Sequence, residues 1–363
     1  MPNVLKHTQF LKDLRERVDK LDQELLNLLL RRMELTRKIG ELKNQGGGFV
    51  YDPAREHFIM EMAKNSTQDP IFSFGLTRIL REVISVCRSV QNGIKVYYLG
   101  PEQSFTHQAL VRAMGRSVEA EPAEDIEEVF SSTEASPNNL GIVPIENSLE
   151  GPVNQTYDLL MERHVCIQRE IYLPITLSLL GHREDLSKAK RVLSHPYAFA
   201  QAKDWIKRNL GHLELVELPS TSKAASMAAG DKDALAIGPL EAAFRYGLKV
   251  LKESIPLKER AITRFVLLGH GYTKETGRDK TSICFTLAHR PGTLYRALEA
   301  FSEDINLCLI FSRPIKSRPW EYAFFVDFEG HFQDPKVKLC LKRLEESTLT
   351  FRLLGSYPKE APS

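Results

Sequence analysis

The sequence predicts three domains: an all-α helical domain, an α/β domain with mostly parallel strands, and a βαββαβ domain of the ferredoxin-like kind. In the first, apolar side chains recur four and three residues apart, which is the period of long packed helices. In the second, a short apolar run, a polar turn and a helix follow one another about five times. In the third, the order is strand, helix, strand, strand, helix, strand. We place these domains at residues 1–92, 94–270 and 280–358.

An arginine interrupts the apolar stripe of the first predicted helix. The stripe otherwise consists of Leu14, Val18, Leu21, Leu25, Leu28, Leu35, Ile39 and Leu42. Residues 8–39 contain no Pro or Gly, so about 35 residues can form one helix about 50 Å long. Arg32 takes the missing stripe position, where its guanidinium stays charged and requires an anion or several acceptors. It either fixes the register of packed helices or lines a pocket for an anionic ligand.

Turn residues divide the helical domain into three helices. The glycine run at 46–48 ends the first helix. The Asp-Pro pair at 52–53 supplies an N-cap and a first-turn proline for a second helix. A further Asp-Pro pair at 69–70 opens a third helix, which we expect to run through Gln91. The Asn-Gly pair at 92–93 then marks a domain boundary.

Polar side chains follow the predicted strands of the α/β domain. They are Ser104, Thr106, Asn147, Ser148, Ser194, Thr221 and Ser222. In α/β folds ligands bind beyond the carboxyl ends of the strands, where helix N-termini offer free N–H groups to anions. Any one of these residues can simply cap a helix. Together they indicate a pocket for a small anion.

The third domain offers few side chains suited to catalysis. Its predicted strands are TSICFTLAH, INLCLIFS, YAFFVDFE and LTFRLLGSY, with helices at 291–302 and 335–345. We therefore expect this domain to serve binding or assembly rather than chemistry.

Composition excludes several classes of protein. The 363 residues carry a net charge of +2 and no basic run, so we expect neither nucleic-acid nor membrane partners. The five cysteines are scattered without a CxxC pair or clustered histidines, which argues against a structural zinc and for reduced thiols in the cytoplasm. The first residues lack the apolar core of a signal peptide, and no apolar run approaches the roughly 20 residues that span a bilayer.

Several long motifs, in a family's order, carry a resemblance. They are LGPEQSFT, VPIENSLEGPVNQTYDLL, SHPYAFAQ, STSKAA, ITRF and shorter motifs near Gly292 and Arg313. The chain resembles the bifunctional chorismate mutase–prephenate dehydratases of phenylalanine biosynthesis over nearly its whole length. The resemblance implies an intertwined helical dimer domain, a two-lobed catalytic domain like periplasmic binding proteins, and a regulatory ACT domain. It also implies that no metal or organic cofactor is required.

The resemblance assigns chorismate-binding roles in the helical domain. The rearrangement to prephenate is intramolecular, so an enzyme can accelerate it by holding the reactive conformer and stabilising charge on the breaking ether oxygen. Arg32 is implied to hold a carboxylate and Lys43 to donate to the ether oxygen. Eleven residues separate the two, about three helical turns, so both point to the same side. Gln91 is implied to be a second donor near the ether oxygen.

Other matches concern the substrate hydroxyl and the pocket wall. Asp52 and Glu56 match the residues that address the hydroxyl, and Arg55 lies beside them. Cys87 takes a place where the family commonly has a small hydroxyl residue, and we expect it to line the pocket.

Arg15 matches a carboxylate-binding residue that one chain cannot use. It lies 17 residues before Arg32, about 25 Å away along one helix and about 100° around it. In the family an intertwined dimer brings this arginine into the partner's site, so we expect a homodimer or a higher homo-oligomer. Without the resemblance, Arg15 would be read as a solvated arginine on an exposed face.

The resemblance also assigns the second reaction, in which prephenate loses carbon dioxide and its ring hydroxyl to give phenylpyruvate. The essential threonine of the TRF motif is Thr263, at the start of a predicted strand, and we expect it to donate a hydrogen bond to the leaving hydroxyl. Glu146 and Asn147 end another strand, and a buried Glu with a raised pKa can act as an acid. The residues matching another wall of the cleft are Ser194, His195 and Gln201.

The implied ACT domain would bind phenylalanine and regulate the dehydratase. Its first motif contains Gly292, Thr293 and Leu294, and its second contains Ser312 and Arg313. Phe311 replaces the usual Glu of the second motif, so feedback by phenylalanine or by another effector stays open.

Two other interpretations stay open. In one, the dehydratase prefers arogenate, the amino-acid analogue of prephenate. Alternatively, the chain is an amino-acid sensor made of a two-lobed binding domain and an ACT domain, although a sensor has no need of the helical domain's cationic constellation.

Overall fold

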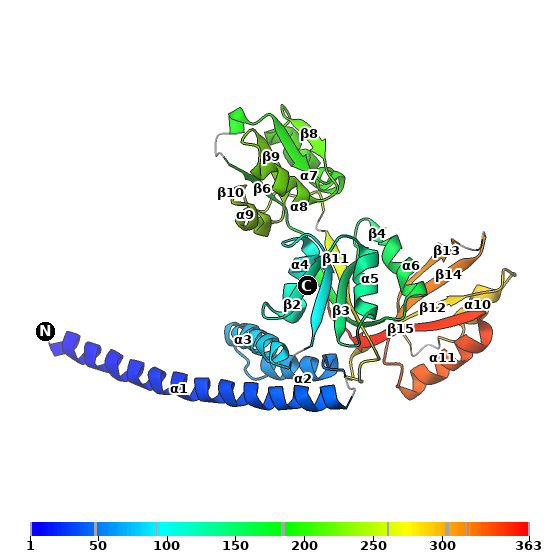
Figure 1. Ribbon diagram of the computed structural model, residues 1–363, viewed down its shortest axis with the longest axis horizontal. Coiled ribbons are helices and arrows are strands. Elements are labelled where there is room, and N and C mark those ends of the chain that lie inside the picture. The colour runs from blue at the N-terminus through cyan, green and yellow to red at the C-terminus, as the bar shows by residue number, and fades with distance from the viewer. Residues whose placement is uncertain are drawn as a thin grey trace.

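The protein is described from a computed structural model of the chain. The description covers residues 2–46, 49–91, 93–182, 186–259, 261–301, 305–316, 318 and 320–361. Over these residues the chain forms a helical N-terminal domain, two mixed α/β lobes and a C-terminal antiparallel sheet (Figure 1). The predicted three-part fold class is confirmed.

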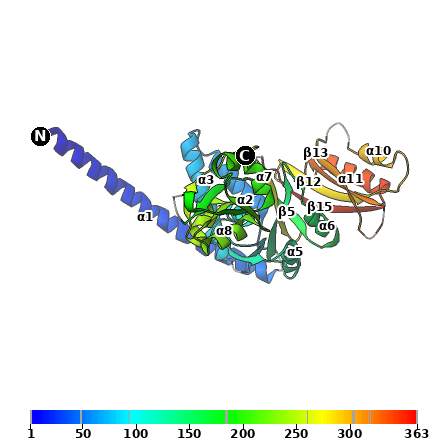
Figure 2. The ribbon, with the colours of Figure 1, turned by 90° about the horizontal axis from the view of Figure 1, so that it is seen from above.

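The helical domain contains α1 (Pro2–Gln45), α2 (Pro53–Lys64) and α3 (Pro70–Ser89). Helix α1 has 44 residues, about 66 Å, and is thus longer than expected at its N-terminal end. Its first half extends away from the rest of the protein (Figures 1 and 2). Asp52 and Asp69 cap α2 and α3 as predicted, whereas α3 ends two residues before Gln91. Gly47, Gly48 and Asn92 of the predicted stop signals lie outside the described residues.

Gly40 of α1 lies directly after the run of residues 8–39 that contains no Pro or Gly. A Cβ atom on Gly40 would lie 2.7–2.8 Å from the backbone and Cβ of Gln91. Only glycine permits this approach. The contact fixes where α1 crosses the end of α3.

The first lobe is a sheet in the order β2-β1-β3-β11-β5, with β4 paired to β3. Its strands are β1 (Lys95–Leu99), β2 (Glu119–Ala123), β3 (Asn139–Asn147), β4 (Gly151–Pro152), β5 (Cys166–Pro174) and β11 (Ile262–Gly269). Its helices are α4 (Phe105–Met114), α5 (Ile126–Glu134) and α6 (Asn154–Glu162). Strand β11 returns from the second lobe and pairs antiparallel with both β3 and β5.

The second lobe is a sheet in the order β10-β6-β9-β7-β8. Its strands are β6 (Ser178–Gly181), β7 (Arg191–Ser194), β8 (Glu214–Glu217), β9 (Ala234–Gly238) and β10 (Lys249–Lys252). Its helices are α7 (Pro196–Asn209), α8 (Thr221–Ala229) and α9 (Leu240–Tyr246), with a 3₁₀ turn at Leu186–Lys188. The expectation of mostly parallel strands is wrong, because strands that enter or leave each lobe pair antiparallel, as β6 does with β9.

The C-terminal domain is a four-stranded antiparallel sheet in the order β13-β14-β12-β15. Its elements are β12 (Asp279–Thr286), α10 (Thr293–Leu298), β13 (Leu307–Pro314), β14 (Tyr322–Glu329), α11 (Pro335–Ser347) and β15 (Thr350–Pro358). The predicted element order is confirmed. Helix α10 is shorter than the predicted 291–302, and Ser302 lies outside the described residues.

Apolar packing joins the C-terminal domain to the first lobe. Val266 of β11 and Tyr157 of α6 share a buried cluster with Phe325 of β14 and Tyr357 of β15. The rings of Tyr157 and Phe325 lie 4.8 Å apart in an edge-to-face arrangement. Among the described helices, none combines the length and apolar character that crossing a membrane requires.

Candidate active sites

The contact between α1 and α3 brings three predicted mutase residues together. Arg32 Nη1 lies 2.6 Å from Cys87 Sγ. Gln91 Nε2 donates to the Cys87 carbonyl at 3.3 Å, and the buried Gln91 Oε1 has no hydrogen-bond partner among the described residues. Because buried polar atoms are normally satisfied, a guanidinium and an unsatisfied amide at one junction are suited to a polar ligand.

Lys43 and Asp52 lie at the two ends of the connection between α1 and α2. Lys43 Nζ donates to the Val50 carbonyl at 3.0 Å. The Asp52 carboxylate accepts from the Arg55 backbone N–H at 3.0 Å, while the Arg55 guanidinium lies 5.3 Å from the centre of the Phe58 ring. These predicted residues are therefore held by local contacts.

Glu56 is held by an arginine that the sequence analysis did not single out. Arg88 Nε and Nη2 donate to the two Glu56 carboxylate oxygens at 2.6 and 2.8 Å. Arg88 Nη1 also donates to the Met114 carbonyl of α4, which ties α3 to the first lobe. Burial opposes the Arg88 charge, yet the Glu56 carboxylate raises the pKa of Arg88 above its usual value. The SVCRSV segment offered no signal for this pairing, because the partner lies 32 residues away.

Arg15 does not reach this site within one chain. It is exposed on the part of α1 that extends away from the rest of the protein (Figure 1). Since α1 is one continuous helix, Arg15 and Arg32 stay about 25 Å apart along its axis.

The predicted threonine of the second site lies opposite Asn147. Thr263 and Asn147 are register partners in β11 and β3, and Asn147 Nδ2 donates to Thr263 Oγ1 at 2.9 Å. Asn147 Oδ1 accepts from the backbone N–H groups of Leu149 and Glu150 at 2.9 and 3.2 Å. These bonds fix the amide orientation, so the Thr263 hydroxyl keeps its own proton available for donation.

A tyrosine from the second lobe reaches the same pair. Tyr197 Oη donates to Asn147 Oδ1 at 3.1 Å, and α7 of the second lobe carries it. The sequence analysis quoted this residue within SHPYAFAQ but gave it no role. Asn147 therefore bonds to Thr263 of the first lobe and to Tyr197 of the second, so the Asn147–Thr263 pair lies where the lobes meet.

The other predicted wall residues support α7. Ser194 is fully buried and donates to the Ile237 carbonyl at 2.7 Å. His195 caps α7, its Nδ1 accepting from the Tyr197 backbone N–H at 3.3 Å. Gln201, one turn after Tyr197, has a buried Oε1 without a hydrogen-bond partner among the described residues.

The prediction that Glu146 neighbours Thr263 is wrong. Glu146 pairs in register with Arg264, one residue along from the Asn147–Thr263 pair. Successive side chains of a strand point to opposite faces, so Glu146 and Thr263 lie on opposite faces of the sheet. The Glu146 carboxylate lies 3.7 Å from Arg264 Nη1 and is half-exposed.

Arg264 forms a buried ion cluster between the first lobe and the C-terminal domain. Its Nη1 lies 2.6 Å from Asp327 Oδ2, and its Nε lies 3.0 Å from Glu170 Oε2. Its Nη2 donates to Tyr357 Oη at 2.9 Å, and Lys280 Nζ lies 2.7 Å from Glu170. Although burial opposes the charge, Asp327 and its neighbours raise the pKa of Arg264 well above its usual value.

The two residues of the second predicted effector motif face opposite sides of β13. Ser312 is exposed and pairs in register with Phe324, which lines a small pocket with Thr293 and Leu294 next to Gly292. Arg313 points to the opposite face, where its Nη2 donates to the Asp158 carboxylate of α6 at 2.6 Å. The structure thus brings Ser312 toward the first motif and places Arg313 against the first lobe.

In the described part of the chain, no group of three His, Cys, Asp or Glu side chains could hold a metal ion.

Comparison with known proteins matches the chain to two families. Residues 14–92 match the chorismate mutase type II family and residues 96–273 match the prephenate dehydratase family. The chain is 40% identical over 354 residues to the bifunctional chorismate mutase/prephenate dehydratase of Aquifex aeolicus (strain VF5), covering 96% of this chain and 98% of that protein. It is 34% identical over 356 residues to the protein of the same name from Stutzerimonas stutzeri, covering 96% and 98%.

A solved structure covers the lobes and the C-terminal domain. The prephenate dehydratase of Arthrobacter aurescens in complex with L-Phe is 33% identical, with a TM-score of 0.67 over 73% of this chain and 90% of that chain. The full-length identity and both family matches lead to one conclusion. The chain belongs to the family of bifunctional chorismate mutase/prephenate dehydratases.

Proposed function

We propose that chorismate rearranges to prephenate at the α1–α3 junction around Arg32, and that prephenate becomes phenylpyruvate where Asn147, Thr263 and Tyr197 meet. The observation that carries the first assignment is the Arg32–Cys87 contact beside the unsatisfied Gln91 amide. The one that carries the second is the bridging of both lobes by Asn147.

In the mutase site, Arg32 binds a substrate carboxylate, and Lys43 and Gln91 donate to the ether oxygen. Lys43 must exchange its bond to the Val50 carbonyl for one to the substrate. Because charge develops on the ether oxygen as the bond breaks, donors held there stabilise the transition state more than the ground state. Glu56, oriented by Arg88, accepts from the substrate hydroxyl.

The mutase site is completed by a second copy of the chain, whose Arg15 supplies the other carboxylate contact. The stripe of α1 supports this dimer, because apolar side chains there are more than half exposed in one chain. They include Val18, Leu21, Leu25, Leu28 and Leu35. Burying them against a second copy removes this apolar surface from water, which favours association. The other side of α1 carries charges of both signs, so it does not set charges of a single sign against this packing.

In the dehydratase site, the Thr263 hydroxyl donates to the ring hydroxyl of prephenate. Asn147 donates to Thr263 Oγ1, which leaves the threonine proton directed to the substrate. The bond to the ring carboxylate breaks and its electron pair enters the ring as carbon dioxide leaves, while the C–O bond breaks and the departing hydroxide takes up a proton from solvent to leave as water. Aromatisation of the ring drives the step, so the enzyme mainly orients and polarises the leaving group.

The C-terminal domain regulates the dehydratase by binding phenylalanine near Thr293 and Ser312. The Arthrobacter relative was solved with L-Phe, and the small pocket beside Thr293 is lined by Trp320 and Phe324. Phe311 stands where the family usually has a Glu, so the affinity is expected to differ from that of relatives with the carboxylate.

Two substitutions test the assignments separately. Arg32→Ala should abolish prephenate formation from chorismate and leave phenylpyruvate formation from added prephenate intact. Thr263→Ala should do the reverse. Retention of both activities in both variants would overturn the residue assignments.

Mixed dimers test the shared site. Arg15→Ala and Arg32→Ala chains, each inactive as mutase, should regain activity after subunit exchange, because one site of each mixed dimer is intact. No recovery after verified exchange contradicts the contribution of Arg15 from the partner.

A further inference from the structure

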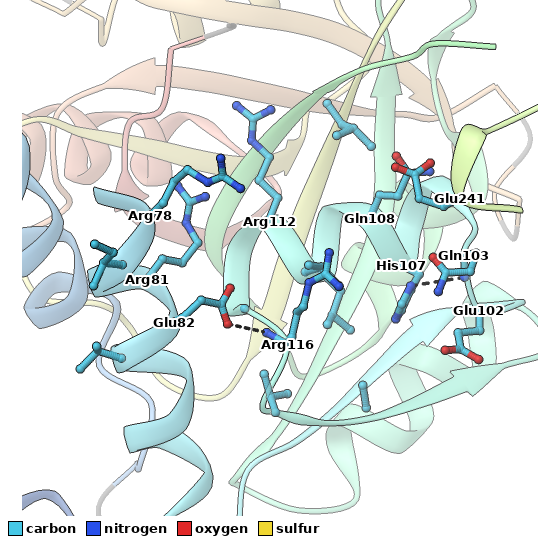
Figure 3. A pocket seen from close by; sticks show the side chains of 18 residues that line it. Arg78, Arg81, Glu82, Glu102, Gln103, His107, Gln108, Arg112, Arg116 and Glu241 are labelled. Atoms are coloured by element: carbon cyan, nitrogen blue, oxygen red, sulfur yellow. Dashed lines mark hydrogen bonds between the residues drawn. The ribbon is translucent and has the colours of Figure 1, made fainter. Parts of the chain in front are cut away.

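A cavity of about 950 Å³ lies between the helical domain and the first lobe, and none of the residues assigned above to the two candidate sites lines it. One wall is α3 of the helical domain, and the opposite wall is α4 of the first lobe (Figure 3). The turn after β1 and the start of α9 in the second lobe complete its lining. Its volume lies at the upper end of the range of small-molecule sites.

Arginines from both domains line the cavity. Arg78 and Arg81 come from α3, and Arg112 and Arg116 come from α4 and its end. Figure 3 shows the guanidinium groups of Arg78, Arg81 and Arg112 gathered at one end. Burial, together with the positive charges of Arg169 and Arg112, lowers the pKa of Arg81, and the carboxylates of Glu360 and Glu82 offset this lowering only in part. Like charges brought together at a partly desolvated place are stabilised by an anion.

The two walls are fixed to one another rather than loosely apposed. The Arg116 and Ser117 backbone N–H groups donate to Glu82 Oε2 and Ser85 Oγ of α3 at 3.4 and 3.0 Å. Gly115 has a φ of +74°, and a Cβ there would lie 2.5 Å from the Ser85 side chain. This close contact at one side holds the arginines of the two domains at a constant separation.

The other end of the cavity reaches the dehydratase cleft. Glu102 and Gln103 follow β1, which pairs in parallel with β3. Carboxyl ends of parallel neighbours share one sheet edge, and Asn147 of the candidate dehydratase site ends β3. Glu241 reaches this end from the second lobe, so the carboxylates of Glu102 and Glu241 lie toward the cleft, whereas that of Glu82 lies on α3 beside the arginines.

We propose that this cavity is a binding site for the dicarboxylate prephenate, held between the domain that forms it and the cleft that consumes it. The proposal rests on the two activities assigned above. Guanidinium groups bind carboxylates in a bidentate manner, and two walls of arginines suit two carboxylates. Apolar side chains suited to the six-membered ring also line the cavity: Ile79, Val83, Leu110 and Val111.

Binding stoichiometry tests the site directly. Prephenate is titrated calorimetrically into the full chain carrying Arg32→Ala and Thr263→Ala, in which neither site turns it over. Addition of Arg81→Gln and Arg112→Gln should remove one equivalent of bound prephenate per chain or weaken the affinity for that equivalent at least tenfold. Addition of Arg208→Gln is the matched control, because Arg208 is exposed on α7 and donates only to the Asp204 carbonyl.

Equal stoichiometry and affinity with and without Arg81 and Arg112 would overturn the proposal, as would an equal loss in the Arg208→Gln control. Arg78→Gln provides a second variant, because Arg78 is exposed and its replacement leaves the domain contact intact. Arg78→Gln should weaken the affinity for the same equivalent of prephenate severalfold. An unchanged affinity in this variant would contradict the arginine wall even if the double variant failed to fold.

Turnover tests the role without any change to the active sites. With chorismate as substrate, Arg81→Gln with Arg112→Gln should release several times more free prephenate per phenylpyruvate than the unaltered chain. An unchanged ratio contradicts a holding site. If the proposed function were wrong, activity would survive Arg32→Ala or Thr263→Ala. The ratio of free prephenate to phenylpyruvate could still be measured, so the two failures are distinguishable.

Discussion

Replacing Arg264 by Met tests whether the ion cluster between the first lobe and the C-terminal domain stabilises the protein. The side chain of Arg264 is 5% exposed and lies against the carboxylates of Asp327 and Glu170. Without it, Glu170 keeps Lys280 as a partner at 2.7 Å. Among the described residues, Asp327 then keeps the hydrogen bond from the Ser282 hydroxyl at 2.6 Å and no cation, so its charge stays buried and unpaired.

The expected loss follows from that unpaired charge. Removing one partner of a buried ion pair costs about 3–5 kcal/mol, which is roughly two to three and a half powers of ten in the unfolding equilibrium. With a urea slope of about 3 kcal/mol per M, the unfolding midpoint should fall by roughly 1–1.7 M. Replacing Asp327 by Leu in the same chain removes the unpaired charge and should restore most of the loss, because apolar replacement of a whole buried pair is often neutral.

Urea unfolding followed by circular dichroism measures the effect for the Arg264→Met chain and for the chain that also carries Asp327→Leu. Dehydratase activity should fall in the single variant, because Arg264 adjoins Thr263 on β11, while mutase activity should persist. A single variant within about 1 kcal/mol of the unaltered chain would refute the reasoning. So would a double variant as unstable as the single one, since the loss would then not arise from the buried Asp327 charge.

Three further outcomes are expected. Gly40→Ala should lose mutase activity and about 1–3 kcal/mol of stability through the clash with Gln91, measured by thermal unfolding. Gly75→Ala, with no neighbouring atom within 4 Å of the new Cβ, should instead gain up to about 1 kcal/mol. Tyr197→Phe should lower dehydratase kcat about tenfold and spare the mutase, because it removes the hydrogen bond from Tyr197 to Asn147 at the dehydratase site. The hydrogen bond from Arg313 lowers the pKa of Asp158 below its ordinary 3.8. This contact stabilises fully above pH 3.8 and is lost as pH falls through the lowered value, so the urea midpoints of the unaltered chain and Asp158→Asn should converge only in strong acid.

The helical domain could be predicted closely because its signals are local. The Asp-Pro pairs at 52–53 and 69–70 begin the helices where the structure begins them, and the glycine run follows the end of α1. The apolar stripe indicated that Arg32 interrupts a packing surface, and Cys87 is indeed its contact. The N-terminal extension of α1, from residue 8 back to Pro2, was missed because Pro2 is compatible with the first turn of a helix.

Residues of the lobes were harder to place, because strand register depends on distant segments. Thr263 pairs with Asn147, which is 116 residues earlier, and an offset of one residue on either strand would bring Glu146 to its side instead. Nothing in ITRF or VPIENS specifies that offset. The second lobe also intervenes between the two strands, so the antiparallel return of β11 was not evident.

The sequence by itself determined the order of domains, the starts of α2 and α3 and the identity of most polar residues at the candidate sites, because each depends on local periodicity, capping and motif. Only the tertiary structure decided which arginines are buried with carboxylates and which line a cavity. Arg88, Arg264 and Arg81 look alike in the sequence. Their environments differ because the partners or walls around each come from other domains, and burial is a property of that assembly rather than of the residue.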